Sequence, residues 1–375
     1  MEANQIAQEW KQHLIGQDHA IKAVMPFVTK YLVALNRPNR PVGNFLFLGP
    51  TGSGKTRAIE ALAQVLHGSP TNMLKVDCGE FQMEHEVAKL IGSPPGYLGH
   101  RETHPVFSQQ RINSVTSEDC DLSIVLFDEI EKAAPSMWRL LLGILDKATL
   151  RLGDNTVVNF ERCLIAMTSN VGATEMANLL SNSWGFGNGN AGADPHLYSS
   201  DSGLQKLQKM GQGALSRKFP PEFENRLDSV ITFRPHTHET LESITHVELE
   251  ELQQHITNRL GEKAFQIIAE PEVVQFLVAN GTSGKFGARE LKRTIDRHLY
   301  DPIVVDFADH KIGQGDTVRI FANGNGLGWE VIHQDAPSPI AVVASCDTCA
   351  KQEICVDANI DKAADVAVCA NFEQK

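Results

Sequence analysis

The chain has 375 residues, 42% hydrophobic and 21% charged, which is ordinary for a globular protein with two or three packed domains. Its net charge of −12 and its lack of any 18-residue apolar run argue against a nucleic-acid binder and against a transmembrane helix. The polar N-terminus shows no apolar segment typical of a secretory signal, so we expect a cytoplasmic protein with no membrane contact.

Helices and short apolar runs alternate along the first 235 residues. Residues 1–40 have helical periodicity, and a loop around Pro38 and Pro41 follows them. Three fully apolar runs are then expected to be strands, at residues 45–48, 124–127 and 164–167, and residues 73–76 and 229–233 are expected to form two more. The alternation predicts an α/β domain over residues 41–235, with a parallel sheet and helices on both faces.

The remaining residues differ from this pattern. Residues 236–322 predict a small, mainly helical domain, with helices over 237–260 and 288–299. Residues 323–375 begin rich in Gly and Asn, and we expect them to form a flexible tail.

The seven cysteines fall into two groups. Cys78, Cys120 and Cys163 lie in or near apolar segments and are expected to be buried thiols. The other four crowd into the tail, where they are either free thiols or ligands of a structural zinc ion: Cys346, Cys349, Cys355 and Cys369. A single C-x-x-C with two irregularly placed partners is a weak zinc pattern.

One stretch matches the phosphate-binding pattern G-x-x-x-x-G-K-[ST] at every fixed position: Gly49-Pro50-Thr51-Gly52-Ser53-Gly54-Lys55-Thr56. It follows an apolar run and opens a helix, which is the context that the pattern requires. Glycines allow backbone N–H groups to surround phosphate oxygens, Lys55 can reach the β- and γ-phosphates, and the Thr56 hydroxyl can bind Mg²⁺. We therefore expect this stretch to be a loop that binds ATP and Mg²⁺, rather than an ordinary glycine-rich turn.

Polar residues follow two further apolar runs. Asp128 and Glu129 come after residues 124–127, and Thr168-Ser169-Asn170 comes after residues 164–167. Because the carboxyl ends of parallel strands meet at one edge, these residues are expected beside the phosphate loop. Asp128 would hold Mg²⁺, Glu129 would activate the attacking water, and Asn170 would help to position it. An acidic pair after a strand can instead begin a helix.

Longer motifs surround these residues: Asp128-Glu129-Ile130-Glu131-Lys132-Ala133, Thr168-Ser169-Asn170-Val171-Gly172, Phe219-Pro220-Pro221-Glu222-Phe223-Glu224-Asn225-Arg226-Leu227-Asp228, and Gly287-Ala288-Arg289. In this order and spacing they resemble the Clp-type AAA+ ATPases, and in particular the second motor module of ClpB, ClpC and ClpA. The likeness covers roughly residues 14–320. It implies a P-loop AAA+ sheet and a small lid domain, in one motor module of a homo-oligomeric ring. In this family the ring is a hexamer that uses ATP hydrolysis to thread unfolded proteins through its pore.

The resemblance also implies roles for single residues. Asn170 matches the sensor-1 position, and Arg226 matches an arginine finger that reaches the γ-phosphate bound by the neighbouring subunit. Arg289 matches the sensor-2 arginine, which contacts the nucleotide of its own subunit. Ile15 and Gly16 match the segment beside the adenine.

The same resemblance implies that two loops with aromatic residues contact other proteins. Gly92-Ser93-Pro94-Pro95-Gly96-Tyr97-Leu98-Gly99 is similar to the pore loop by which Clp unfoldases grip substrate, and Gly96, Tyr97, Leu98 and Gly99 would contact it. Trp184-Gly185-Phe186 lies where some unfoldases carry a tripeptide that docks on a ClpP-like peptidase. These aromatic residues either fill a pocket on such a peptidase or anchor the loop to its own domain.

Three alternatives stay open on the sequence. A nucleic-acid motor or loader would need basic pore residues, so Tyr97 and the net charge of −12 count against a nucleic-acid partner. An assembly protein that binds ATP without hydrolysis would be favoured by the loss of Glu129 or Arg226, and both are present. Arg226 could also form only a surface salt bridge, with Glu222 or Asp228.

Overall fold

The computed structural model describes residues 2–92, 105–176, 201–281, 287–324 and 326–333. By their contacts these residues divide into two compact units. Of the described residues, those within 2–251 and 271–301 form the first unit, and those within 252–270 and 302–333 form the second. Within the described part of the chain, no helix combines the length and the apolar character needed to cross a membrane.

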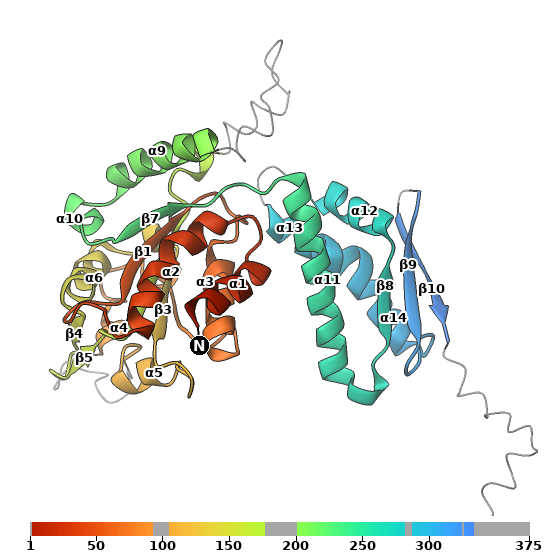
Figure 1. Cartoon of the computed structure of the whole chain (residues 1–375), viewed down its shortest axis with the longest axis horizontal. Coiled ribbons are helices and arrows are strands. Elements are labelled where there is room, and N and C mark those ends of the chain that lie inside the picture. The colour runs from red at the N-terminus through yellow and green to blue at the C-terminus, as the bar shows by residue number, and fades with distance from the viewer. Residues whose placement is uncertain (1, 93–104, 177–200, 282–286, 325, 334–375) are drawn as a thin grey trace, which may run out of the picture. The chain divides into compact units, whose positions relative to one another are not determined.

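A five-stranded parallel sheet lies at the centre of the first unit (Figure 1), in the strand order β2-β3-β6-β1-β7. The strands are β1 (Gly43–Leu48), β2 (Leu74–Asp77), β3 (Ser123–Asp128), β6 (Cys163–Ser169) and β7 (Ser229–Thr232). The register places Leu48 opposite Ser169 and Asp77 opposite Asp128, so the carboxyl ends of these strands share one edge. The five predicted strands are thus confirmed as one sheet.

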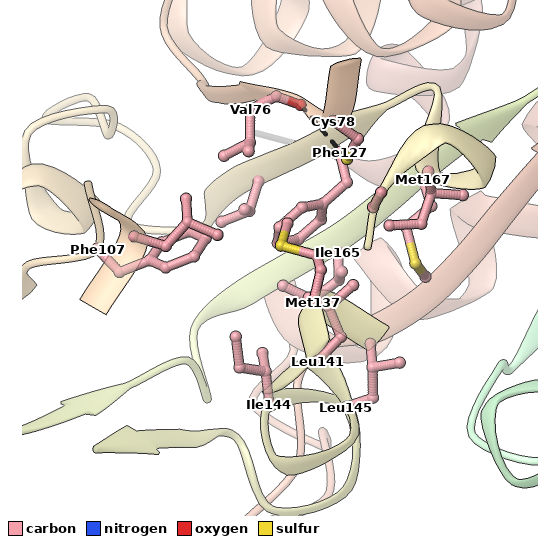
Figure 2. Close-up of a cluster of buried hydrophobic side chains, with 14 of the residues drawn as sticks. Val76, Cys78, Phe107, Phe127, Met137, Leu141, Ile144, Leu145, Ile165 and Met167 are labelled. Carbon is pink, nitrogen blue, oxygen red and sulfur yellow. Dashed lines mark hydrogen bonds between the residues drawn. The ribbon is translucent and has the colours of Figure 1, made fainter. Parts of the chain in front are cut away.

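Alternate residues of the strands face two separate apolar cores, as expected for a sheet covered on both sides. Val125 and Phe127 of β3 belong to the first core, whereas Ile124 and Leu126 belong to the second. Figure 2 shows the first core, where α6 (Pro135–Lys147) directs a row of side chains toward the sheet: Met137, Leu141, Ile144 and Leu145. Both faces of the sheet are therefore packed against helices.

The second core is covered by α1 (Ala3–His13), α2 (Asp18–Leu32) and α3 (Lys55–His67). Trp10 of α1 is fully buried there, and its indole N–H donates a hydrogen bond of 2.8 Å to the Ala58 carbonyl of α3. Because α3 begins within the phosphate-binding sequence, this bond ties the first helix of the chain to the element that presents that loop. Helices thus occupy residues 3–13 and 18–32 of the segment that was predicted to be helical.

Trp10→Ala is expected to lower the free energy of unfolding by about 3–5 kcal/mol, because it opens a large cavity and removes the bond to Ala58. Trp10→Phe keeps most of the volume and should lower it less. Gln8→Ala, at an exposed position of the same helix, is the matched control. Urea unfolding measures all three, and a Trp10→Ala protein as stable as the Gln8→Ala control would contradict the expectation.

Several shorter elements complete the first unit. They are α4 (Ala88–Ile91), α5 (Gln109–Asn113), the hairpin β4 (Thr149–Arg151) and β5 (Val157–Asn159), α9 (Asp201–Lys218), α10 (Pro221–Glu224), most of α11 (His238–Leu260), α12 (Pro271–Gly281), α13 (Ala288–Ile295) and the π-helical turn η4 (Asp296–Tyr300). Single 3₁₀ turns cover Cys78–Glu80 and Ile130–Lys132 here, and Gly261–Lys263 in the second unit.

The three cysteines outside the tail are buried free thiols, as predicted. Burial raises the pKa of each of them, Cys78, Cys120 and Cys163, which keeps them protonated and unreactive. The four cysteines for which the sequence offers either a zinc site or free thiols lie outside the described residues: Cys346, Cys349, Cys355 and Cys369.

The second unit contains a three-stranded sheet in the order β10-β9-β8, together with α14 (Asp301–Ala308). The strands are β8 (Gln266–Ala269), β9 (Thr317–Asn323) and β10 (Gly326–Ile332). The sequence did not predict these strands. The boundary expected at residue 322 is also wrong, because β10 pairs with β9 from Gly326 opposite Asn323 to Ile332 opposite Thr317. The Gly- and Asn-rich stretch that suggested a tail is the connection of a hairpin.

Candidate functional site

The phosphate loop connects β1 to α3 at the shared edge of the sheet. Gly49, Gly52 and Gly54 all have positive φ angles, of 149°, 76° and 92°, which glycine adopts without steric strain. No side chain caps the N-terminus of α3, which begins at Lys55. The free N–H groups and the helix dipole at such an end favour an anion. The loop thus has the backbone geometry of a phosphate cradle.

Lys55 is buried, with 7% of its surface exposed, at the centre of this edge. Its ammonium group donates hydrogen bonds to the carbonyls of Gly49 (2.8 Å) and Pro50 (2.9 Å) and to Oδ1 of Asn170 (2.9 Å). Burial lowers the pKa of Lys55 to about 8, although the neighbouring carboxylates act in the opposite direction: Glu131, Asp128 and Glu129. A positive charge is therefore held where three acids meet the phosphate loop.

Asp128 directs its two carboxylate oxygens to different partners. Oδ1 accepts hydrogen bonds from the hydroxyls of Thr56 (3.2 Å) and Thr168 (2.5 Å). Oδ2 lies 3.2 Å from the ammonium group of Lys75 on β2. A hydroxyl and a carboxylate oxygen at this separation are hard ligands of the kind that Mg²⁺ prefers. The pair Thr56 and Asp128 therefore fits a small divalent cation.

Glu129 and Asn170 contact each other beside this pair. The Asn170 side-chain amide donates to Oε1 of Glu129 at 3.2 Å, and Lys132 forms an ion pair with the same carboxylate. Glu129 has a left-handed backbone with φ of 56°, and its N–H donates to the Thr168 hydroxyl at 2.9 Å. The backbone N–H of Asn170 donates to Oε1 of Glu131 at 3.0 Å. These bonds fix the ends of β3 and β6 against each other.

An open pocket of about 570 Å³ lies over this edge. It is lined by ten of the residues that the sequence predicted for a nucleotide site: Ile15, Thr51, Gly52, Gly54, Lys55, Thr56, Asp128, Glu129, Asn170 and Arg289. Gly16, Gly49, Pro50 and Ser53 are chain neighbours of these residues but do not line the pocket. Arg289 enters it because the N–H of Ala288 donates to the Gly52 carbonyl at 3.2 Å.

The sequence did not single out several other residues of the pocket. Leu14, Ile244 and Val247 add apolar surface. The polar or charged additions are His13, Arg57, Glu60, Lys75, Asp77, His236, Glu248 and Lys292. Lys292 and Glu248 form an ion pair of 2.8 Å. His236 lies four residues after the end of β7, so the rule that strand ends carry functional groups gave a weak signal for it.

His236 is a partly buried residue whose two ring nitrogens are buried beside Gly52 of the phosphate loop. Burial lowers its pKa from 6.5 to about 4, and the Gly52 carbonyl offsets part of this effect. Because the pKa is lower in the folded state, the folded protein resists protonation of this ring. The free energy of unfolding is therefore at its full value above pH 6.5, and it decreases as the pH falls from 6.5 toward 4.

His236→Gln is therefore expected to reduce the acid sensitivity of folding. Wild-type protein should lose up to about 1.4 kcal/mol per pH unit more than the variant between pH 6.5 and pH 4. Urea unfolding at several pH values measures this difference, with the exposed His246→Gln as the matched control. Parallel pH profiles for wild type and His236→Gln would disprove the assignment.

Arg226 does not line this pocket. Its guanidinium lies 3.2 Å from the carboxylate of Asp146 on α6, rather than pairing with Glu222 or Asp228 as the alternative interpretation expected. The predicted pore residues Gly96, Tyr97, Leu98 and Gly99 lie outside the described residues, as does the Trp184–Phe186 loop.

Known protein families and proteins are similar to this chain over most of its length. Residues 40–230 match the AAA domain (Cdc48 subfamily), and residues 237–320 match the C-terminal, D2-small domain, of ClpB protein. The chaperone protein ClpB of Meiothermus ruber is 34% identical over 325 residues, which are 86% of this chain and 34% of that protein. The chloroplastic chaperone protein ClpC3 of Oryza sativa subsp. japonica is 36% identical over 315 residues, 84% of this chain and 32% of that protein.

Solved structures of Hsp104 show the same architecture. The S. cerevisiae Hsp104:casein complex in its extended conformation is similar with a TM-score of 0.73 and 26% identity, over 88% of this chain and 52% of that one. The closed state of Hsp104 with ATPγS and FITC casein gives a TM-score of 0.71 over the same shares.

The chain spans about a third of the length of these curated relatives. Its matches still cover both the sheet domain with the phosphate loop and the segment that carries Arg289. The chain therefore belongs to the AAA domain family (Cdc48 subfamily), among the Clp-type AAA+ ATPases.

Proposed function

We propose that this chain binds ATP with Mg²⁺, hydrolyses it, and uses the energy to thread unfolded polypeptides through a ring of identical subunits. One observation carries the ATPase part of the proposal. The phosphate loop, Asp128, Glu129 and Asn170 come from three different strands and line one pocket. An assembly protein that only bound nucleotide would not need the Glu129–Asn170 pair beside the phosphate loop.

The residues divide the work of hydrolysis by position. The phosphate loop and Lys55 bind and orient the triphosphate, with the ammonium exchanging its bonds to loop carbonyls for bonds to phosphate oxygens. Glu129 accepts the proton of the attacking water at its carboxylate, and Asn170 holds both Glu129 and that water in place. Arg289, which lines the same pocket, adds positive charge beside the phosphates.

The cation follows from the same ligand set. Thr56 and Asp128 would hold Mg²⁺, which supplies charge neutralisation between phosphate oxygens when it is bound. Thr168 and Lys75 hold the Asp128 carboxylate in one orientation through its two oxygens. Both partners restrict rotation of the side chain.

The threading part of the proposal is supported by the relatives. Two Hsp104 structures contain casein, and the ClpB relatives are named as chaperones. Tyr97, Gly96, Leu98 and Gly99 would grip the chain in the pore. Docking on a ClpP-like peptidase through Trp184–Phe186 stays a prediction from the sequence.

A substrate-stimulation assay tests this proposal. ATPase activity is measured with and without unfolded casein, for wild type and for Tyr97→Ala. We expect casein to stimulate wild type, and Tyr97→Ala to keep basal hydrolysis while losing the stimulation. Stimulation by single-stranded DNA instead of casein would favour the nucleic-acid motor and would overturn threading.

A further inference from the structure

Arg226 is held by more than its own ion pair. Its backbone carbonyl accepts a hydrogen bond of 3.0 Å from the side-chain amide of Asn44. The same amide donates a second bond of 3.0 Å to the carbonyl of Leu145, which directly precedes Asp146. Asn44 is fully buried. One buried side chain therefore fixes the backbones of Arg226 and Asp146 relative to each other.

This arrangement lies at the end of β1 that is remote from the phosphate loop. Asn44 is near the start of β1 and Gly49 follows its last residue, a separation of about 17 Å at the rise of an extended strand. Arg226 precedes β7, which runs parallel to β1, so it belongs to the same remote end. The guanidinium is therefore placed away from the nucleotide pocket of its own subunit.

We propose that Asp146 is a positioning residue that orients the Arg226 guanidinium for action on the nucleotide of a neighbouring subunit. The inference rests on the proposed ATPase function. Arg226 and Asp146 keep 44% and 36% of their side-chain surface exposed, so the ion pair sits at the surface rather than in the core. A single contact of 3.2 Å to one carboxylate oxygen leaves other N–H donors of the guanidinium able to reach phosphate.

The physical benefit is the restriction of a flexible side chain before it acts. An arginine side chain has many rotamers in solvent, and ordering it opposes binding. Asp146 holds the Arg226 side chain in one rotamer before nucleotide is bound. Because an ion pair this exposed is weak, the N–H groups of Arg226 can exchange Asp146 for a more highly charged phosphate. Asp146 would thus affect hydrolysis only through Arg226, and only in the adjacent subunit.

Mixed rings test this directly. One parent subunit carries Glu129→Gln and keeps Arg226, and the other carries Arg226→Ala and keeps Glu129. Neither should hydrolyse ATP efficiently alone, whereas a mixture should regain activity where the first parent supplies Arg226 to the second. Asp146→Asn is then added to the Glu129→Gln parent. The nucleotide site of that parent is already inactive. A local effect of Asp146→Asn on that site therefore cannot change the ATPase rate of the mixed rings.

We expect Asp146→Asn to lower the regained ATPase rate by about two- to fivefold, the range for the loss of a well-oriented surface ion pair. Asp146→Glu should restore part of it, and the exposed Asp119→Asn on the same parent is the matched control. ADP binding and ring size by chromatography report folding and assembly. Equal rescue with and without Asp146→Asn would overturn the inference, whereas failure of the two parents to complement would overturn the proposed action of Arg226 itself.

A second measurement covers the case in which Asp146→Asn disturbs assembly. In rings of one subunit type, Arg226→Ala is compared with the double variant Asp146→Asn, Arg226→Ala. If Asp146 acts through Arg226, the double variant has the rate of Arg226→Ala alone. A further drop in the double variant would show a separate structural role and would also overturn the inference.

Discussion

Replacing Glu129 with Gln is expected to lower the ATPase rate by about 10²- to 10⁴-fold, while ATP binding stays close to that of wild type. Gln has the same shape and can still accept the 3.2 Å hydrogen bond from the Asn170 amide. It cannot accept a proton from water. The loss should therefore appear in kcat, with the nucleotide dissociation constant little changed.

Steady-state phosphate release and titration with a fluorescent ATP analogue separate these two effects. Glu118→Gln, at an exposed position far along the chain from the phosphate loop, is the matched control and should behave as wild type. A Glu129→Gln protein that hydrolysed ATP at the normal rate would exclude Glu129 as the base. A variant that lost binding together with hydrolysis would assign the residue to nucleotide binding instead.

Replacing Lys55 with Ala is expected to weaken nucleotide binding by about a hundredfold, the effect of one or two lost charge-assisted hydrogen bonds. The ammonium contacts the carbonyls of Gly49 and Pro50 and the Asn170 side chain, so its removal also frees the loop that surrounds the phosphates. The neighbouring acids Asp128 and Glu129 would then repel an anionic ligand more strongly, although their ion pairs with Lys75 and Lys132 still neutralise part of their charge.

Calorimetric titration with ADP measures the affinity of Lys55→Ala directly. Lys22→Ala, on the exposed face of α2, removes the same charge from the surface and serves as the control. Circular dichroism checks that both variants are folded. Wild-type affinity in a folded Lys55→Ala protein would contradict the assignment of the phosphate cradle.

Much of the fold was predictable because it depends on local pattern. Each of the three inner strands of the large sheet, β1, β3 and β6, contains an apolar run that is buried on both faces, and the functional side chains follow these runs. The edge shared by Lys55, Asp128 and Asn170 therefore followed from the rule for parallel strands, without knowledge of strand order. The order β2-β3-β6-β1-β7 itself was not predictable from the runs.

What sequence reasoning missed depends on contacts between distant segments. His236 and Lys75 line the pocket through positions that no short motif encodes. The partner of Arg226 is Asp146, a residue 80 positions earlier, so local charge spacing pointed to the wrong carboxylates. The small sheet was missed because its strands mix polar and apolar residues, and because one of them follows a Gly- and Asn-rich stretch that is more typical of a tail.

The packing of strand β3 fixes the position of the acidic pair Asp128 and Glu129 at its end. Its neighbouring side chains enter two different cores, so a slide by one residue would put Phe127 where Leu126 belongs and would disrupt both interiors. The next permitted slide, by two residues, would displace Asp128 by about 7 Å. The edge of the sheet is therefore rigid, because no strand register lies between these two positions. Any conformational change that accompanies hydrolysis is expected in the segments attached to this edge.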